Sequence, residues 1–374
     1  MAQIVAAAAA VHAPQLLSRP PHEDPVKLDA STDALRQFGA VLDETRPDVI
    51  LLIGLDHLET FWLEAVPAFT LILSPTVTAH YMARSKTVTV HTELAERLLR
   101  GVLAQDFDLT YSQEAVLGHA FLTPLEYIVG DRAIPVVPLL VNTYLPPIPS
   151  PRRAFALGAA IARAWADRPE RVAVIASGGM SHFPGTARYH QPDFGFDEWV
   201  LAEITHGRWD DLLDLSPVNL DEVGESELMT WFTALGVIGK VPGTLLSYQE
   251  LSHHGHGVVQ FLPALGGPPE EGEPRPRYGG HEFTQTDYVY YRFPDPASLP
   301  LNRMLHRIIT DQRYRTEFVQ HRDSVVAAAG LRAEESAALL SGESFDALTA
   351  VGAHPLLALS ARQVSELERS RIGG

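Results

Sequence analysis

The stretch QIVAAAAAVHAP, residues 3–14, joins an apolar, strand-like run to a short loop that carries a histidine. Two further runs have the same form: Val49–Ile53 leads to His57, and Val172–Ile175 leads through a Gly-Gly turn to His182. In open α/β sheets, ligands bind in the crevice beyond the carboxyl ends of the strands. Three histidines delivered there by separate strands predict a metal or acid–base site as well as a fold.

Strand-like runs alternate with helical patterns through the first 265 residues. The predicted strands are Gln3–Ala10, Val49–Ile53, Ala133–Asn142 and Arg171–Ser177. The predicted helices between them are Ser31–Glu44, Thr92–Leu103 and Arg153–Ala166, the first with Ser31 as its N-cap. Such alternation predicts an α/β fold with a mostly parallel sheet flanked by helices.

The composition changes after residue 265. Gly266–Gly280 is rich in Pro, Gly and charge and predicts a linker, whereas Asp287–Phe293 has the aromatic pattern of a strand. Short helices are predicted at Leu301–Thr310, Glu317–Ala329, Ala333–Leu340 and Phe345–Val351. We therefore expect a large domain over residues 1–265, a linker and strand over 266–300, and a small all-helical C-terminal domain over 301–374.

The charge balance and the residue types absent from the chain limit the possible functions. With 46 acidic and 29 basic residues, the net charge is −17, which argues against nucleic acid and anionic membrane surfaces as partners. The chain has no cysteine, which excludes disulfides, thiolate metal ligands and a cysteine nucleophile. The apolar run Ile4–Val11 follows no basic region and is too short to span a bilayer, so we expect a buried strand and a cytoplasmic protein.

A metal site without cysteine must use histidine and carboxylate ligands. Two histidines and one carboxylate form the arrangement that suits Fe(II) and oxygen chemistry, because positions on the metal stay open. His12 and His57 are the candidate imidazoles, since each follows a strand. A single histidine at a strand end is more often a hydrogen-bonded loop residue, but its recurrence favours the ligand interpretation.

The carboxylate is expected from a predicted helix over Asp221–Leu235, which mixes acidic and apolar residues. Glu227 shares a face with Trp231, four residues later, and could project inward. Glu222 and Glu225 are competitors, and all three could equally lie on a solvated surface. Spacing alone leaves that choice open.

Two more histidines have a functional and a structural interpretation. His182 follows Gly178-Gly179, where the backbone can approach a bound molecule closely, although the glycines could form only a tight turn. His119 follows Gly118 and could assist a site or simply begin a helix.

The ordered set of these motifs resembles the class III extradiol ring-cleavage dioxygenases of the LigAB type, which include protocatechuate 4,5-dioxygenase and gallate dioxygenase. The matching pieces are Val11-His12-Ala13-Pro14, Gly54-Leu55-Asp56-His57-Leu58, Gly118-His119-Ala120-Phe121, Gly178-Gly179-Met180-Ser181-His182 and Glu227-Leu228-Met229-Thr230-Trp231. Each piece is weak alone, but all of them occur in the family's order over residues 1 to about 265.

The resemblance implies that His12, His57 and Glu227 bind Fe(II), with Glu227 selected because it stands four residues before the tryptophan. It also implies that His182 is the acid–base residue and that His119 assists it. The implied reaction inserts both atoms of O2 into a catecholic ring (protocatechuate, gallate or a related aromatic acid), with meta cleavage to a semialdehyde-type product. A homodimer is a further expectation from the family.

Two alternatives keep the fold but change the function. The first is a zinc site with hydrolytic chemistry, and the second is a non-catalytic relative that acts as a binding or structural subunit. The presence of all five residues argues against the second, because a degenerate copy would be expected to lose some of them.

The tail, Leu301–Gln363, is similar to the small helical subunit that covers the active site of the protocatechuate enzyme. The matching features are Leu301-Asn302-Arg303-Met304-Leu305, Gly330-Leu331-Arg332-Ala333-Glu334-Glu335 and Val351-Gly352-Ala353-His354-Pro355-Leu356-Leu357. The resemblance implies a fused lid, and a stability or dimerisation element is the alternative. The histidine-rich stretch Ser252–Gly257 departs from the family pattern.

Overall fold

The computed structural model describes residues 3–262, 275–342 and 344–373. The chain forms two compact units. The first unit comprises Met1–Tyr144, Ile148–His182 and Pro192–Asp287, and the second comprises Leu145–Pro147, Phe183–Gln191 and Tyr288–Gly374. Residues 266–274 of the predicted linker lie outside the described residues, and Arg277–Gly280 of its remainder forms a short 3-10 helix.

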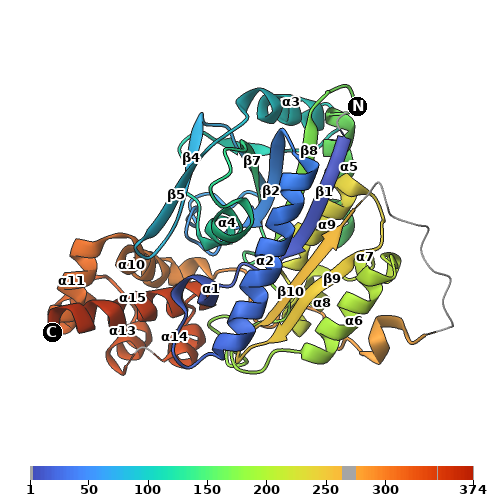
Figure 1. Cartoon of the computed structure of the whole chain (residues 1–374). Helices are drawn as coiled ribbons and strands as arrows, with labels where there is room; N and C mark the ends of the chain where they lie inside the picture. The colour runs from blue at the N-terminus through green and yellow to red at the C-terminus, as the bar shows by residue number, and fades with distance from the viewer. Residues whose placement is uncertain (1–2, 263–274, 343, 374) are drawn as a thin grey trace. The chain divides into compact units, whose positions relative to one another are not determined.

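The first unit is built on an eight-stranded sheet in the order β6-β3-β7-β2-β8-β1-β10-β9 (Figure 1). Its strands are β1 (Gln3–Ala10), β2 (Val49–Leu55), β3 (Phe69–Ile72), β6 (Thr110–Ser112), β7 (Val136–Val141), β8 (Arg171–Ser177), β9 (Thr244–Glu250) and β10 (Gly255–Phe261). A separate two-stranded sheet pairs β4 (Thr76–Tyr81) with β5 (Arg84–Thr89).

The four central strands β7, β2, β8 and β1 are parallel. They are the four strands predicted from the sequence. A strand that is buried on both faces has a nearly continuous apolar sequence, which makes it recognisable. The strand on each side of these four pairs antiparallel with its neighbour: β3 pairs with β7 on one side, and β10 pairs with β1 on the other. The prediction of an α/β fold with a mostly parallel sheet is confirmed.

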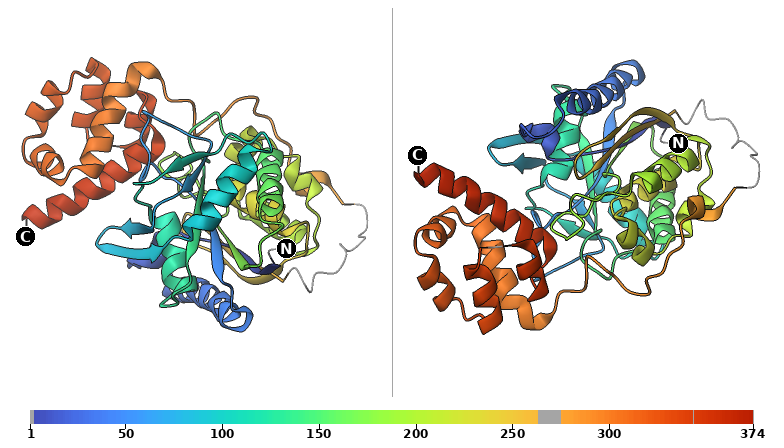
Figure 2. Two further views of the ribbon diagram at one scale, coloured as in Figure 1. Left: turned by 90° about the horizontal axis from the view of Figure 1, so that it is seen from above. Right: turned by 90° about the horizontal axis from the view of Figure 1, so that it is seen from below.

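Helices cover both faces of this sheet (Figure 2). Those of the first unit are α1 (Gln15–Ser18), α2 (Pro25–Thr45), α3 (Thr92–Leu103), α4 (His119–Pro124), the π-helical η1 (Leu125–Val129), α5 (Pro151–Ala164), α6 (Phe194–Thr205), α7 (Asp210–Leu213), α8 (Pro217–Val223) and α9 (Leu228–Ile238). Alternate β2 residues, Val49, Leu51 and Ile53, join a buried core with apolar side chains of α3, α5 and α9. Helix α2 contacts β1, β9 and β10.

Two helix predictions in this unit were wrong at their boundaries. Helix α2 begins at Pro25, since the Asp24 side chain accepts the Val26 N–H at 2.9 Å, and Ser31 therefore lies inside the helix instead of capping it. The predicted helix Asp221–Leu235 is two helices, because α8 ends at Gly224 with φ +78°. A left-handed glycine of this kind closes a helix.

The second unit contains η3 (Pro296–Ser298) and the helices α10 (Leu299–Thr310), α11 (Gln312–Gln320), α12 (Arg322–Ala328), α13 (Ala333–Leu340), α14 (Phe345–Ala350) and α15 (Pro355–Gly373). The helical C-terminal region is thus confirmed. The predicted helix Glu317–Ala329 is broken at His321, where φ is −132°. Asp287–Phe293 forms bends and coil instead of a strand, and its aromatic rings pack individually: Tyr290 lies edge-on to Phe183, and the Tyr291 hydroxyl donates to the Pro184 carbonyl at 3.1 Å.

Among the residues that the structure describes, no helix has the length and apolar character needed to cross a membrane.

Candidate metal centre

Three neighbouring strands deliver the predicted histidines to one edge of the sheet. His12 follows β1 by two residues, His57 follows β2 by two, and His182 follows β8 by five. Strands β2, β8 and β1 are adjacent and parallel, so their carboxyl ends meet. His119 is the first residue of α4, and Glu227 immediately precedes α9.

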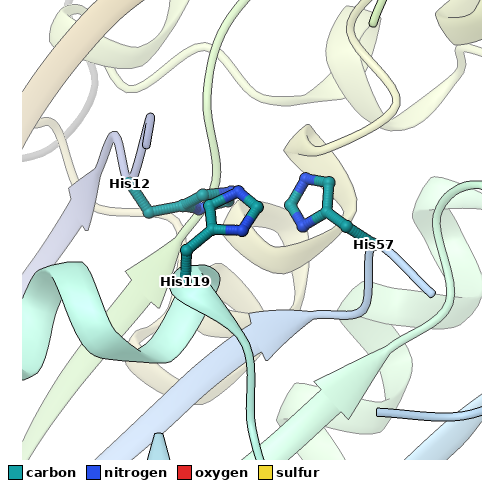
Figure 3. A group of neighbouring side chains, drawn as sticks. All are labelled: His12, His57 and His119. Atoms are coloured by element: carbon teal, nitrogen blue, oxygen red, sulfur yellow. The ribbon is translucent and has the colours of Figure 1, made fainter. Parts of the chain in front are cut away.

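The Glu227 carboxylate lies at the centre of this group and is fully buried. Its Oε1 is 3.0 Å from His57 Nε2 and 3.2 Å from His182 Nε2, and its Oε2 is 3.4 Å from His12 Nε2. Nitrogens of His12, His57 and His119 also lie within 4.8 Å of one another, and Figure 3 shows their rings gathered at one place. The structure therefore brings all five predicted site residues together.

Backbone and side-chain donors hold the carboxylate in place. The Gly179 N–H donates to Glu227 Oε2, and the Tyr144 hydroxyl, 2.8 Å from Oε1, donates to the other oxygen. A Cβ at Gly178 would lie 2.7 Å from the Glu227 carbonyl oxygen. Gly178 thus allows close approach of two backbone segments. The functional interpretation of the motif, approach of the backbone to a bound molecule, stays a prediction.

Hydrogen bonds on the far side of two rings fix which nitrogen faces Glu227. The Ser177 hydroxyl donates to the Ala120 carbonyl, so its oxygen accepts from His12 Nδ1 at 3.1 Å. His182 Nδ1 donates to the Met180 carbonyl at 2.7 Å. With Nδ1 protonated in both rings, each Nε2 presents a lone pair toward a carboxylate oxygen. Each Nε2 and the carboxylate oxygen that it faces, 3.2–3.4 Å away, are then both electron-pair donors, which suits them to bind a cation together.

The charges follow from burial and proximity. Burial would raise the pKa of Glu227, but the adjacent His12 and His182 outweigh it and hold that pKa well below its usual range. Burial lowers the pKa of His12, and burial together with the nearby His119 lowers the pKa of His57 to about 4. An anionic carboxylate beside the neutral imidazoles of His12 and His57 is the protonation state that a divalent metal requires of these three ligands.

His119 has a carboxylate partner that the sequence analysis did not identify. Its Nδ1 lies 2.9 and 3.0 Å from the two oxygens of Glu59, and its backbone N–H donates to Oε2 at 3.0 Å. Burial would raise the pKa of Glu59, but His119 outweighs it and lowers that pKa to about 2. Burial would lower the pKa of His119, but Glu59 outweighs it and raises that pKa.

The two competing glutamates lie elsewhere. Glu225 is fully buried, and burial together with the charge of Asp197 raises its pKa well above the usual range, so it holds a proton. Glu222 accepts hydrogen bonds from Thr284 and from the Gln285 N–H. Among the three acidic candidates, Glu227 is the one whose oxygens meet the histidines.

Tyr144, Ser177 and Glu59 were missed by the sequence analysis because none stands in a local pattern with the residue it contacts. His254, whose ring stacks on that of His182 with centroids 3.9 Å apart, was missed too. The histidine-rich stretch Ser252–Gly257 carried a usable signal. Its first three residues lie between β9 and β10, and its last three begin β10. The Val11 N–H donates to the Gly257 carbonyl at 2.9 Å, so the stretch lies beside His12.

Residues 6–259 match the family described as the catalytic LigB subunit of aromatic ring-opening dioxygenase, which is more than half of the chain. The chain belongs to the LigB family. The matched range contains His12, His57, His119, His182 and Glu227 and coincides with most of the first unit.

Named relatives agree with the LigB assignment. The chain is 32% identical over 170 residues to 2,3-dihydroxyphenylpropionate/2,3-dihydroxicinnamic acid 1,2-dioxygenase 2 of Dechloromonas aromatica, covering 45% of this chain and 54% of the relative. It is 34% identical over 175 residues to the corresponding enzyme of Mycolicibacterium vanbaalenii, covering 46% and 54%. It is 29% identical over 271 residues to gallate dioxygenase of Pseudomonas putida, covering 66% and 76%. The LigB chain therefore spans about half the length of the dihydroxyphenylpropionate relatives.

Proposed function

We propose that this LigB protein is an Fe(II)-dependent extradiol dioxygenase that cleaves a catecholic ring. The observation that carries the proposal is the buried Glu227 carboxylate, which three histidine nitrogens approach within 3.4 Å in a family described as ring-opening dioxygenases. The named relatives act on dihydroxyphenylpropionate and gallate, which are aromatic acids with adjacent ring hydroxyls. The proposed substrate class is accordingly a catechol that bears an acidic group, such as protocatechuate or gallate.

The donor set fits the proposed metal. His12 and His57 would supply neutral imidazoles and Glu227 a carboxylate, which is the two-histidine, one-carboxylate set associated with Fe(II) oxygenases. The side chain of Glu227 is fully buried and that of His12 is 1% exposed, so bulk water does not screen the carboxylate. Bound there, Fe(II) would supply open positions for two adjacent ring oxygens and for dioxygen.

The proposed proton transfers use residues of this chain. His182 is placed to accept the proton of a ring hydroxyl at Nε2, because its Nδ1 proton is held by the Met180 carbonyl. The Tyr144 hydroxyl lies 3.0 Å from His182 Nε2 and donates its proton to Glu227 Oε1, which leaves the Nε2 lone pair free to accept. His119 would assist at the same ring through Nε2, since Glu59 occupies its Nδ1. Both atoms of O2 enter the product, so the reaction needs no external reductant.

The first test is anaerobic reconstitution with Fe(II), followed by admission of air over protocatechuate, gallate, 2,3-dihydroxyphenylpropionate and unsubstituted catechol. One equivalent of O2 consumed per substrate, with a yellow ring-opened product, is the expected result for at least one compound. No oxygen uptake across the panel, with zinc retained in place of iron, would favour the hydrolase alternative instead.

Ligand and acid–base roles separate in a second test. His12→Ala and Glu227→Gln should lose bound iron, whereas His182→Ala should keep iron and lose turnover. Metal analysis of each purified variant decides the assignment. A normal iron content in His12→Ala would contradict the proposed ligand set. We further propose that residues 301–374 act as the fused counterpart of the small subunit; the homodimer and the cytoplasmic location stay predictions.

A further inference from the structure

Glu59 is a largely buried acidic residue to which the proposed reaction assigns no proton transfer. It lies in the loop that follows β2, and Asp56 fixes the shape of that loop. One oxygen of Asp56 accepts the N–H groups of Glu59 and Thr60, each at 2.9 Å, and the other accepts that of Phe61 at 2.8 Å. Three backbone bonds to one carboxylate leave the Glu59 backbone little freedom to move.

Both oxygens of Glu59 serve as acceptors for a single residue. Oε2 accepts the His119 backbone N–H at 3.0 Å, and Oε1 lies 2.9 Å from the Nδ1 of the same ring. The His119 side chain is 8% exposed and that of Glu59 is 23% exposed, so the contact is shielded from most solvent. One carboxylate therefore holds both the start of α4 and the ring attached to it.

Gly118 makes room for this contact. A Cβ at position 118 would lie 1.7 Å from Glu59 Oε2 and 3.0 Å from its Cβ. The backbone of Gly118 has φ −88° and ψ −167°, which is extended and open to any residue. The glycine is thus required by the space that Glu59 fills and not by its backbone conformation.

The opposite side of the His119 ring faces the candidate metal ligands. The ring stacks on His57 with centroids 4.2 Å apart, and it meets His12 edge-on at 5.4 Å (Figure 3). Since Nδ1 is engaged by Glu59, Nε2 is the nitrogen left to face a bound ligand.

We propose that Glu59 is a positioning residue, which holds the His119 ring through its Nδ1 so that Nε2 is the nitrogen presented to the substrate. The consequence for catalysis rests on the proposed function, but the contact itself does not. The alternative is that Glu59 only caps α4 and has no effect on the ring.

Glu59→Gln tests the proposal with almost no change in shape. A glutamine has one acceptor oxygen, so its NH2 group must face either the backbone N–H or the ring N–H of His119. We expect kcat to fall about tenfold or more, with KM and iron content unchanged, in keeping with the loss of a second partner to a functional histidine. Glu64→Gln is the matched control, because Glu64 is an exposed carboxylate in the same loop and should leave kcat unchanged.

A spectroscopic readout keeps the test independent of turnover. In 15N-histidine NMR of the metal-free protein, with His119→Ala to assign the resonance, the wild type should show a protonated, hydrogen-bonded Nδ1 at His119. In Glu59→Gln this signal should move or disappear. An unchanged His119 signal would overturn the positioning role, whether or not any catechol is turned over; failure of oxygen uptake in the wild type would overturn only the proposed reaction.

Gly118→Ala tests the contact between Glu59 and His119 by filling the space that the Glu59 carboxylate occupies. The new methyl group should displace the Glu59 carboxylate and reproduce the changes of Glu59→Ala in both kcat and the His119 spectrum. In the double variant, Gly118→Ala should add little to Glu59→Ala, because the atom it displaces is already gone. Additive losses would show that the two positions act separately and would contradict the proposal.

Discussion

The imidazole rings of His182 and His254 lie face to face, with centroids 3.9 Å apart and planes 16° from parallel. His254 is 3% exposed, and its Nε2 makes no hydrogen bond to any residue that the structure describes. A Cβ at Gly179 would lie 1.9 Å from that Nε2, so the glycine leaves the space that the ring occupies. His254 therefore contacts His182, the proposed acid–base residue, by stacking of the two flat rings.

Replacing His254 tests this relationship. His254→Phe keeps a flat ring and should retain kcat within about twofold, whereas His254→Ala should lower kcat about tenfold, which corresponds to about 1.4 kcal/mol and is within the range of ring-stacking energies. Iron content should be normal in both. Steady-state kinetics with metal analysis make the measurement, and equal impairment of the two variants would show that the imidazole nitrogens matter more than stacking.

Tyr144 connects the proposed base to the proposed ligand, with its hydroxyl 3.0 Å from His182 Nε2 and 2.8 Å from Glu227 Oε1. Tyr144→Phe removes a hydrogen bond to a charged group, worth about 1.5–3 kcal/mol, so kcat/KM should fall about 10- to 100-fold. Tyr111→Phe is the control, because Tyr111 is 55% exposed and its replacement should leave kcat/KM unchanged. Oxygen-uptake kinetics on the iron-loaded proteins decide the result, and a fully active Tyr144→Phe would refute it.

His256 predicts a pH dependence of stability. Burial, with a contribution from the nearby His253, lowers the pKa of His256 from 6.5 to about 3. Below pH 6.5, His256 binds a proton in the unfolded chain but stays neutral in the folded protein. The free energy of unfolding therefore decreases as the pH falls from 6.5 toward 3, by up to about 1.4 kcal/mol per pH unit. Above pH 6.5 the effect is absent.

Urea unfolding of metal-free protein at pH 5 and pH 7 measures this dependence. His256→Leu should lose less stability than the wild type between the two pH values, whatever its stability at pH 7. His22→Leu, at an exposed histidine, should keep the wild-type difference. If His256→Leu and the wild type lose the same amount, His256 is not the responsible group.

Asn302 links two of the motifs in the second unit. Its amide donates to the Ser298 carbonyl at 3.1 Å and to the Gly352 carbonyl at 3.0 Å, and its oxygen accepts the His354 N–H at 2.8 Å. Asn302 is fully buried, so Asn302→Ala leaves its three backbone partners without this hydrogen bond. The free energy of unfolding of the second unit should fall by about 2–4 kcal/mol. Hydrogen exchange of peptides from α10 and residues 351–354 reports the change, and Arg303→Ala, at an exposed neighbour, should leave it unaltered.

The central strands could be predicted because each is buried on both faces and is therefore a nearly continuous apolar run. β1 and β8 match the predicted ranges residue for residue. The short flanking strands β3 and β6 were not predicted, since their four and three residues carry too little pattern and depend on pairing with distant segments. The helix boundaries at Pro25 and Gly224 depended on a cap and a left-handed glycine, which local chemistry could have indicated.

The site, like the fold, has a part that the sequence predicts and a part that it does not. The histidines could be predicted because each follows an apolar strand, but their supporting partners could not. Glu59 meets His119 across 60 residues, and Tyr144 meets Glu227 across 83. No sequence period relates such positions, and the fold alone brings them together.

The glycines at the candidate metal centre have a consequence for the family as a whole. Glu59 fills the space beside Gly118, and His254 fills the space beside Gly179. Each glycine is therefore the counterpart of one distant side chain, so the two positions of each pair should covary. A LigB relative with a larger residue at the position of Gly118 is expected to lack an acidic side chain at that of Glu59, and to hold the equivalent of His119 by some other group.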